Sequence, residues 1–190
     1  MHENENLVKQ ILDGNDLAFE RLIRNFQRLV SHIVFRMVNN IADREDICQD
    51  VFIKVYKNLS GFRFESKLST WIARIAYNRC INFLEKKKVA LYDDLSEDDK
   101  QYEIRDSADD RPDQIIESAD LKELLTQEIN TLPIQYRTII TLYHLDEMNY
   151  NEIADIMGLP AGTVKSYLFR ARRKLREKLE AKYQREEIWK

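Results

Sequence analysis

The basic residues near the carboxyl end of the chain have the types and spacing needed to bind nucleic acid. They are Lys165, Arg170, Arg172, Arg173, Lys174 and Arg176. Guanidinium and ammonium groups bind phosphates through their charge, and Arg and Lys also donate hydrogen bonds to guanine in the major groove. Apolar residues recur among them at helical spacing, at Val164, Leu168, Ala171 and Leu175. We therefore predict a helix with one packed side and one basic side.

The residues before this basic helix predict a helix-turn-helix between Tyr150 and Leu179. Apolar side chains form a stripe on the first helix, at Ile153, Ala154, Ile156 and Met157. Gly158 suits the end of that helix because glycine adopts the left-handed conformation at low cost, and Pro160 prevents its continuation. We expect Thr163 to cap the second helix. A helix-turn-helix places its second helix in the DNA major groove.

The net charge of −3 conceals an uneven distribution along the chain. The segment 93–120 contains twelve acidic and three basic residues, a net charge of −9, so the remainder carries +6. The acidic segment also lacks a sustained apolar rhythm, and such segments do not fold alone. We interpret it as a flexible linker between two near-neutral or basic parts.

Composition and periodicity predict an all-α protein. Only four Gly and three Pro occur in 190 residues, which favours helices with short connections. Apolar residues at helical spacing predict a first helix that ends at Gly14, a second from a cap at Asp16 to Met37, and a third that starts near Asp43 after the Asn39-Asn40 break. A fourth helix is expected from about Leu68 to Lys88. The helical spacing returns at Ile115 and then at Leu121, and Pro133 suits the first turn of another helix. Two small helical domains joined by the acidic linker are the expected fold.

Other functional classes find little support in the residues. No apolar run approaches the roughly 20 residues that span a bilayer, and the first residues lack the pattern of a signal peptide, so we expect a cytoplasmic protein without membrane insertion. Cys48 and Cys80 fit no metal-site spacing and are expected in or near the core, and His144 is expected to be a satisfied surface histidine. We find no nucleophile-base pair, ligand set or phosphate loop, so we expect no enzyme, cofactor, metal or small-molecule substrate.

Four blocks in order resemble the compact extracytoplasmic-function (ECF) group of bacterial sigma-70 factors. The blocks are DLAFERLIRNF, DREDICQDVFIKVYKNLSGFR, STWIARIAYNRCINFLEKKK and, after the acidic linker, INTLPIQYRTIITLYHLDEMNYNEIADIMGLPAGTVKSYLFRARRKL. Together they cover nearly the whole chain, which is far more specific than a lone helix-turn-helix.

The resemblance implies a domain for each promoter element. Residues 1–90 would bind core RNA polymerase and recognise and melt the −10 element, 91–118 would be the linker, and 119–190 would read the −35 element. The implied partners are core RNA polymerase, through its β′ clamp helices and β flap, promoter DNA, and an anti-sigma factor. Such linkers pass through the basic channels of the polymerase, although a solubilising tether is the simpler interpretation of the composition.

The resemblance assigns polymerase binding to polar residues around the third expected helix. The candidates are Asp46, Gln49, Asp50, Phe52 and Lys54. Three- and four-residue spacing places the polar groups near one another, which composition alone would explain as a solvated helix face. Asp50 stands where many relatives have Glu, which preserves the charge.

The −10 candidates follow this helix, in a loop and the next helix. They are Phe62, Arg63, Arg74, Asn78, Arg79, Lys86 and Lys87. A base drawn out of the stack is held by aromatic faces and amides, while lysines hold phosphates. The spacing of Trp71 and Phe83 indicates core. The chain has Phe64-Glu65 where many relatives have Gly-Asp or Gly-Glu, and Ala73 where some have an aromatic.

The −35 candidates occupy the basic helix. They are Thr163, Lys165, Ser166, Phe169, Arg170 and Arg173. Arg and Lys suit guanine acceptors, and Phe suits a thymine methyl group. Arg172, Arg173 and Arg176 are expected on phosphates, although some of these charges could simply solvate the helix.

Two alternatives to a polymerase subunit follow from the residues. A stand-alone helix-turn-helix regulator would be a dimer on a palindromic site, but the basic and aromatic loop in the first half disfavours it. A helical nuclease built on Asp46 and Asp50 lacks partner carboxylates in the other expected helices.

Overall fold

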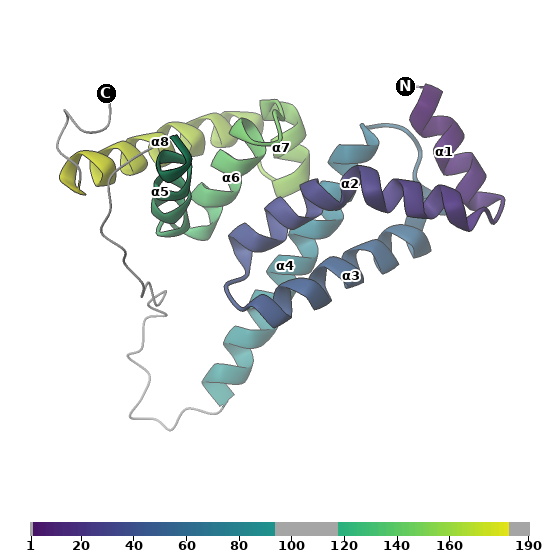
Figure 1. Ribbon diagram of the computed structural model, residues 1–190, viewed down its shortest axis with the longest axis horizontal. Coiled ribbons are helices and arrows are strands. Elements are labelled where there is room, and N and C mark those ends of the chain that lie inside the picture. The colour runs from purple at the N-terminus through teal and green to yellow at the C-terminus, as the bar shows by residue number, and fades with distance from the viewer. Residues whose placement is uncertain (1, 94–117, 183–190) are drawn as a thin grey trace.

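The computed structural model describes residues 2–93 and 118–182, and its elements in these ranges are helices (Figure 1). In chain order they are α1 (His2–Leu12), α2 (Asp16–Met37), α3 (Ile41–Asn58), the 3-10 turn η1 (Leu59–Gly61), α4 (Leu68–Asp93), α5 (Ser118–Asn130), α6 (Ile134–His144), α7 (Tyr150–Met157) and α8 (Ala161–Lys182). The all-α expectation is confirmed. The expected linker 91–118 begins within α4, and its residues 94–117 lie outside the described ranges.

The N-terminal half is built on α2, α3 and α4, which pack against one another, with α1 against α2. The apolar side chains that recur at helical spacing form the core of this half, where Leu22, Ile33, Met37, Ile47 and Ile72 are fully buried. Cys80 is buried and Cys48 half-buried, as expected. Burial raises the pKa of the Cys80 thiol to about 12, so this side chain stays protonated and acts as a small apolar group.

Asparagines, rather than aspartates, begin two helices of this half. Asn15 caps α2, where its side chain accepts a hydrogen bond from the backbone N–H of Ala18, so the expected cap at Asp16 is wrong by one residue. Asn40 caps α3 by accepting from the N–H of Asp43. Asp16 and Asp43 instead lie in the first turns, where a negative charge favours the positive end of the helix dipole.

The helix-turn-helix forms as the sequence indicates, with one correction. Gly158 ends α7 in the left-handed conformation (φ 66°, ψ 33°). Asn149 and Glu152 form a capping box at the start of α7. Thr163 does not cap the next helix, because α8 begins at Ala161 and the Thr163 N–H donates to the carbonyl of Pro160 at 2.8 Å. The fixed φ of proline suits this helix entry.

The two halves pack against each other. Helix α4 lies against α7, and α2 lies against α6 (Figure 1). The buried apolar side chains of both halves form one continuous cluster. None of the helices in the described ranges has the length and apolar character needed to cross a membrane.

Candidate nucleic-acid interface

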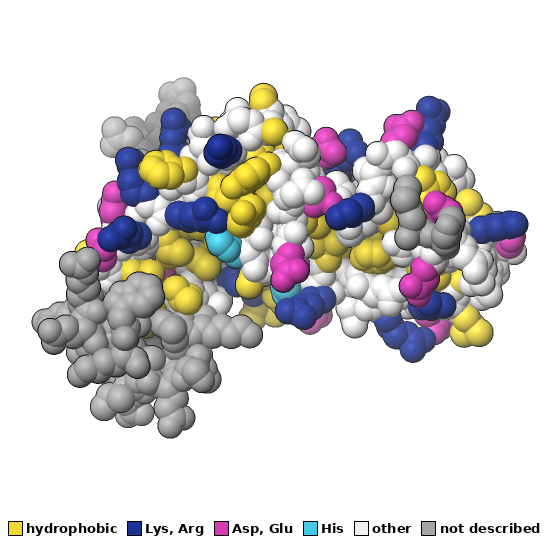
Figure 2. All heavy atoms as spheres, turned by 90° about the horizontal axis from the view of Figure 1, so that it is seen from above, with side chains coloured by type: hydrophobic (Ala, Val, Ile, Leu, Met, Phe, Trp, Pro, Cys, Tyr) yellow, Lys and Arg dark blue, Asp and Glu magenta, His cyan; other side chains and the backbone are white. Residues whose placement is uncertain are grey.

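Helix α8 separates a packed side from a side that faces solvent. Val164, Leu168 and Ala171 are buried, as their spacing predicts. Lys165, Ser166, Phe169 and Arg170 are exposed, and 66% of the Phe169 surface is accessible. Figure 2 shows Lys and Arg side chains together with hydrophobic ones over the half of the molecule that carries this helix. An exposed aromatic ring among cations is suited to base edges and phosphates.

Other residues of α8 are engaged within the helix. Thr163 is half-buried in the first turn, and the Ser166 hydroxyl donates to the carbonyl of Gly162 at 3.0 Å. Arg173 pairs with Glu177 at 3.4 Å, and Arg176 with Glu180 at 2.8 Å. These pairs are exposed, so a phosphate can replace the carboxylates at little cost.

An aromatic and basic cluster lies where α6, α7 and α8 meet. Tyr143 stacks on Tyr150 with 5.3 Å between ring centroids, and the Arg172 guanidinium lies 5.0 Å from the Tyr143 centroid. His144 Nε2 accepts hydrogen bonds from Arg172 Nε at 3.2 Å and Nη2 at 3.0 Å. Partial burial and the Arg172 charge lower the pKa of His144, so the ring is neutral and serves as acceptor. His144 is thus satisfied, as expected.

Sequence reasoning placed Arg172 on phosphates but missed the two tyrosines. Their signal is weak, because Tyr143 falls on the apolar side of its helix and Tyr150 begins the next one. Only the packing of three helices shows that both rings support one arginine.

A shallow pocket of about 340 Å³ lies between the loop 61–66 and α4. Four of the −10 candidates line it: Phe62, Arg63, Arg74 and Asn78. The other lining residues are Gly61, Glu65, Ser66, Trp71 and Ile75. The pocket therefore combines two guanidinium groups, one carboxylate, one amide and aromatic faces, and amides with aromatic faces are the chemistry that holds an unstacked base.

Two aromatic residues of this pocket differ from the sequence-based prediction: Phe62 is more buried than expected and Trp71 is more exposed. Phe62 is only 8% exposed, and its ring centroid lies 5.1 Å from that of Trp71 and 4.7 Å from that of Phe64. Phe62 is therefore chiefly a packing residue. Trp71, expected only in the core, is half-buried and lines the pocket. Phe64 is in the left-handed conformation (φ 57°).

A second hollow of about 320 Å³ lies on the surface between α3 and α4, which pack against each other. Of the polymerase-binding candidates, Asp46, Gln49 and Asp50 line it, together with Asp43, Ile47, Ile53, Arg79 and Phe83. Phe52 packs against the core and Lys54 is exposed, and neither lines the hollow. Ile53 and Tyr56, each 50% exposed, add apolar surface that sequence reasoning missed. Ile53 falls outside the rhythm of the buried Ile47, Val51 and Val55, which was the available signal.

The −10 candidates divide between the two hollows. Arg79 donates from Nε and Nη2 to Asp50 Oδ2 and lines the hollow between α3 and α4. Lys87 lies 3.3 Å from Asp43 Oδ2 and 5.7 Å from the Phe83 centroid. Lys86 is exposed further along α4. The structure therefore groups Arg79 and Lys87 with the carboxylates of α3, away from Phe62 and Asn78.

Comparison with protein families gives two matches in chain order. The model of sigma-70 region 2 matches residues 22–89, and the model of sigma-70 region 4 matches residues 122–175. The first contains α3, the loop and most of α4, and the second contains the helix-turn-helix.

Characterised proteins match over nearly their whole length. The ECF RNA polymerase sigma factor SigW of Bacillus subtilis is 34% identical, over 90% of this chain and 94% of its own. The ECF RNA polymerase sigma-E factor of Haemophilus influenzae is 35% identical, over 92% of this chain and 94% of its own.

A solved structure shares the fold. It is that of the sigma factor RpoE of Bartonella quintana in complex with the anti-sigma factor NepR. The TM-score is 0.67 at 23% identity, covering 87% of this chain and 98% of that chain.

Proposed function

The chain belongs to the ECF group of the sigma-70 family, and on that basis we propose how its surfaces divide the work of transcription initiation. As a sigma factor it binds core RNA polymerase and directs it to promoters. The comparisons do not support a stand-alone regulator. The polymerase performs the chemistry, so we assign no catalytic group to this chain, and its work with the polymerase on the chromosome implies a cytoplasmic location.

Helix α8 is proposed to read the −35 element. Lys165, Ser166, Phe169 and Arg170 form its exposed face, with Thr163 and Arg173 at the margin. Arg170 and Lys165 would donate to guanine, and the exposed Phe169 ring would contact a thymine methyl group. Tyr143, Tyr150 and Arg172 extend this face and would hold an adjacent phosphate. Their rings fix the guanidinium before DNA arrives, which reduces the entropy lost on binding.

The pocket between the loop 61–66 and α4 is proposed to hold a base of the −10 element. Asn78 would donate to and accept from a base edge, and Trp71 would offer the stacking face assigned to Phe62 on sequence grounds. Arg63 and Arg74, both exposed, would bind the flanking phosphates. Lys86 would extend this phosphate contact along α4.

The hollow between α3 and α4 is proposed to dock the β′ clamp helices. Three carboxylates beside the exposed Ile53 offer charge and apolar surface together, which suits a basic amphipathic partner helix. We propose that 1–90 forms the polymerase and −10 domain, 91–118 the linker, and 119–190 the −35 domain, with the β flap contacting the last. An anti-sigma factor is a further proposed partner.

The observation that carries this proposal is the pairing of an exposed basic recognition helix with a base-sized pocket in a separate half of one chain. The test is run-off transcription by core polymerase, with and without the chain, on fragmented genomic DNA. Specific start sites that appear only with the chain support the proposal. Failure of the chain to co-elute with core polymerase would refute it.

Replacing Arg170 with Ala should lower transcription from the recovered promoters about five- to a hundredfold, because one base contact costs roughly 1–3 kcal/mol. Lys178→Ala is the matched control, since Lys178 is an exposed cation near the end of the same helix. Equal losses of transcription in both variants would refute a −35 contact by Arg170 and would indicate a general effect of positive charge.

A further inference from the structure

Phe64 combines a strained backbone with an aromatic ring that is open to solvent. Its φ of 57° lies in the left-handed region, which glycine adopts freely and which residues with a Cβ atom adopt at a cost in free energy. The residue is nevertheless 37% exposed. Strained conformations of this kind persist chiefly at functional sites, so Phe64 is a candidate for a binding role.

Phe64 lies at the rim of the pocket proposed for a −10 base. Its neighbours in the chain, Arg63 and Glu65, both line that pocket, and Phe64 itself does not. Asn78, which is proposed to hold the base edge, lines the same pocket from α4. Successive nucleotides of a DNA strand follow one another at short intervals, so a nucleotide next to a base held by Asn78 passes close to this rim.

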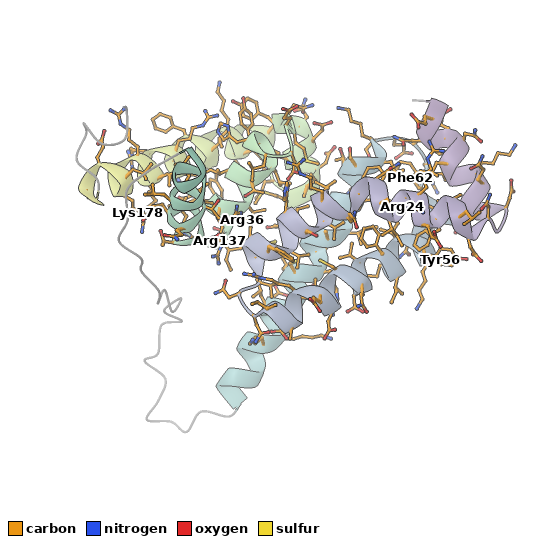
Figure 3. All side chains as sticks on the ribbon, viewed as in Figure 1. Arg24, Arg36, Tyr56, Phe62, Arg137 and Lys178 are labelled. Carbon is orange, nitrogen blue, oxygen red and sulfur yellow. The ribbon has the colours of Figure 1, made fainter. Side chains whose placement is uncertain are left out.

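The Phe64 ring is supported by a row of aromatic rings. Its centroid lies 4.7 Å from that of Phe62, and the Phe62 centroid lies 5.1 Å from that of Trp71. Phe62 is 8% exposed and belongs to the hydrophobic core (Figure 3). The core therefore fixes one side of the Phe64 ring and leaves the rest accessible, which is the arrangement of an aromatic platform on which a base stacks.

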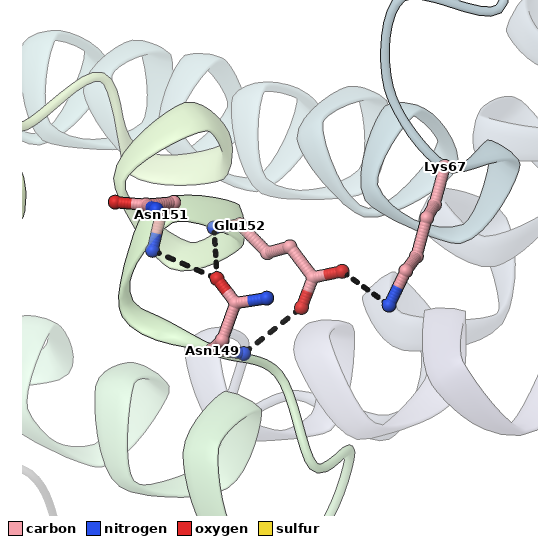
Figure 4. Close-up of polar contacts among 4 residues, drawn as sticks. All are labelled: Lys67, Asn149, Asn151 and Glu152. Carbon is pink, nitrogen blue, oxygen red and sulfur yellow. Dashed lines mark hydrogen bonds and ion pairs between the residues drawn. The ribbon is translucent and has the colours of Figure 1, made fainter.

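Exposed guanidinium groups lie beside this ring. Arg63 and Arg74 both line the pocket, and neither makes an ion pair within the residues that the structure describes. Lys67 follows the loop, but its Nζ lies 2.8 Å from Glu152 Oε1, so its charge already has a partner (Figure 4). An aromatic platform beside unpaired cations suits single-stranded nucleic acid, because the bases stack while the phosphates bind the cations.

Two simpler roles for Phe64 fit these observations less well. A residue needed only to fill the core would be buried, as Phe62 is. A residue needed only to shape the turn would be glycine, asparagine or aspartate, which adopt a positive φ more readily than phenylalanine. A strained residue with an exposed ring therefore points to something that covers the ring.

We propose that the exposed side of Phe64 is a second base site, which stacks the nucleotide next to the one held in the pocket on the opened DNA strand. The adjacent nucleotide loses a stacking partner when its neighbour turns into the pocket, and the Phe64 ring would take the place of that partner. Stacking on an aromatic ring tolerates every base, so this site would add affinity without restricting the sequence. The proposal rests on the proposed function, because it requires a chain that opens promoter DNA.

The experiment measures binding of the chain, joined to core polymerase, to promoter DNA recovered by run-off transcription and mismatched so that its −10 element is open. Phe64→Leu should weaken this binding about 5- to 150-fold, because leucine keeps apolar bulk but loses the face on which a base stacks. Phe64→Tyr keeps the ring and should bind within about twofold of the unaltered chain. Phe35→Leu is the matched control, since Phe35 is 45% exposed on α2 outside the pocket, and should leave binding unchanged.

Abasic sites in the open element locate the stacked nucleotide. For the unaltered chain, removing one base at a time should weaken binding at the position held by Asn78 and at one position next to it. In Phe64→Leu, the abasic site at the adjacent position should have little further effect, because the base and the ring contribute to one interaction. Losses that add to that of Phe64→Leu at every position would overturn the second base site.

Two further measurements separate this proposal from its alternatives. Phe64→Leu should leave the Kd for core polymerase without DNA unchanged, and a weaker Kd would assign the ring to a protein surface instead of a base. If Phe64→Leu binds the open DNA as the unaltered chain does while promoter-specific transcripts persist, the second base site fails and the proposed function stands. If the unaltered chain gives no promoter-specific transcripts, the proposed function fails and the second base site fails with it.

Discussion

At the scale of single residues, Phe64 is the clearest case of a local conflict. Its φ of 57° lies in the left-handed region, which glycine adopts freely and other residues adopt at a cost. The Phe64 ring packs against the ring of Phe62, with 4.7 Å between the two ring centroids. The pairing of the rings therefore offsets backbone strain next to the pocket proposed for a −10 base.

Phe64→Gly should be more stable than Phe64→Ala by about 1 kcal/mol, because both lose the ring and only glycine relieves the strain. Urea unfolding of both variants measures the difference. Glu147, with φ 51°, gives a matched pair, Glu147→Gly and Glu147→Ala, in a second turn. Equal stability of the Gly and Ala variants at Phe64 would show that the conformation carries no strain.

His144 and Arg172 make a pH prediction at the same scale. The pKa of His144 is lower in the folded chain than its usual value of 6.5, so the folded state loses stability relative to the unfolded state as pH falls below that value. NMR titration of the His144 ring should give a pKa below 6.5, and Arg172→Ala should raise it. A pKa of 6.5 or above in the unaltered chain would contradict the charge effect of Arg172.

At the scale of helices, α3 and α4 form one unit through Arg79 and Asp50. Sequence position groups Arg79 with Asn78, but consecutive residues on a helix point about 100° apart, so neighbours serve different surfaces. Asn78 lines the pocket proposed for a −10 base and Arg79 lines the hollow proposed for the clamp helices. One helix thus supports both surfaces.

Arg79→Ala should weaken binding to core polymerase, because Asp50 loses the guanidinium that holds its orientation. A loss of about 1–3 kcal/mol, or five- to a hundredfold in Kd, is expected for a charged hydrogen bond. Arg74→Ala, on the other side of α4, should leave this Kd unchanged and reduce promoter opening instead. Titration with labelled core polymerase and a permanganate footprint measure the two effects. A normal Kd for Arg79→Ala with impaired opening would return Arg79 to the −10 set.

The helices themselves were largely predictable from local signals. Apolar spacing identified the core sides of α2, α3 and α4, and Gly158 ended α7 as expected, because both effects depend on a few neighbouring residues. Caps were less predictable, because Asn15 and Asp16 are both capable of capping and only the backbone path decides between them. Thr163 failed as a cap for the same reason, since Pro160 already directs the chain into α8.

At the scale of the whole molecule, the sequence predicted two halves but not their contact. His32 and Asp146 have no local pattern that links them, and Trp71 lines a pocket only because the loop 61–66 folds over it. The exposed face of α8 was predictable, because an amphipathic helix displays its polar side regardless of its neighbours. A surface formed by one helix was therefore predictable from the sequence, whereas a surface formed by several helices was not.

The continuous apolar core across the two halves has a consequence for the lifetime of the protein. When α2 separates from α6, and α4 from α7, apolar side chains now buried between them meet water. A chain that opened without a partner would offer that surface to aggregation and its loosened connections to proteases. The packing of α2 against α6, and of α4 against α7, therefore protects the chain from aggregation and proteolysis, and a substitution that weakened this packing would shorten the lifetime of the protein.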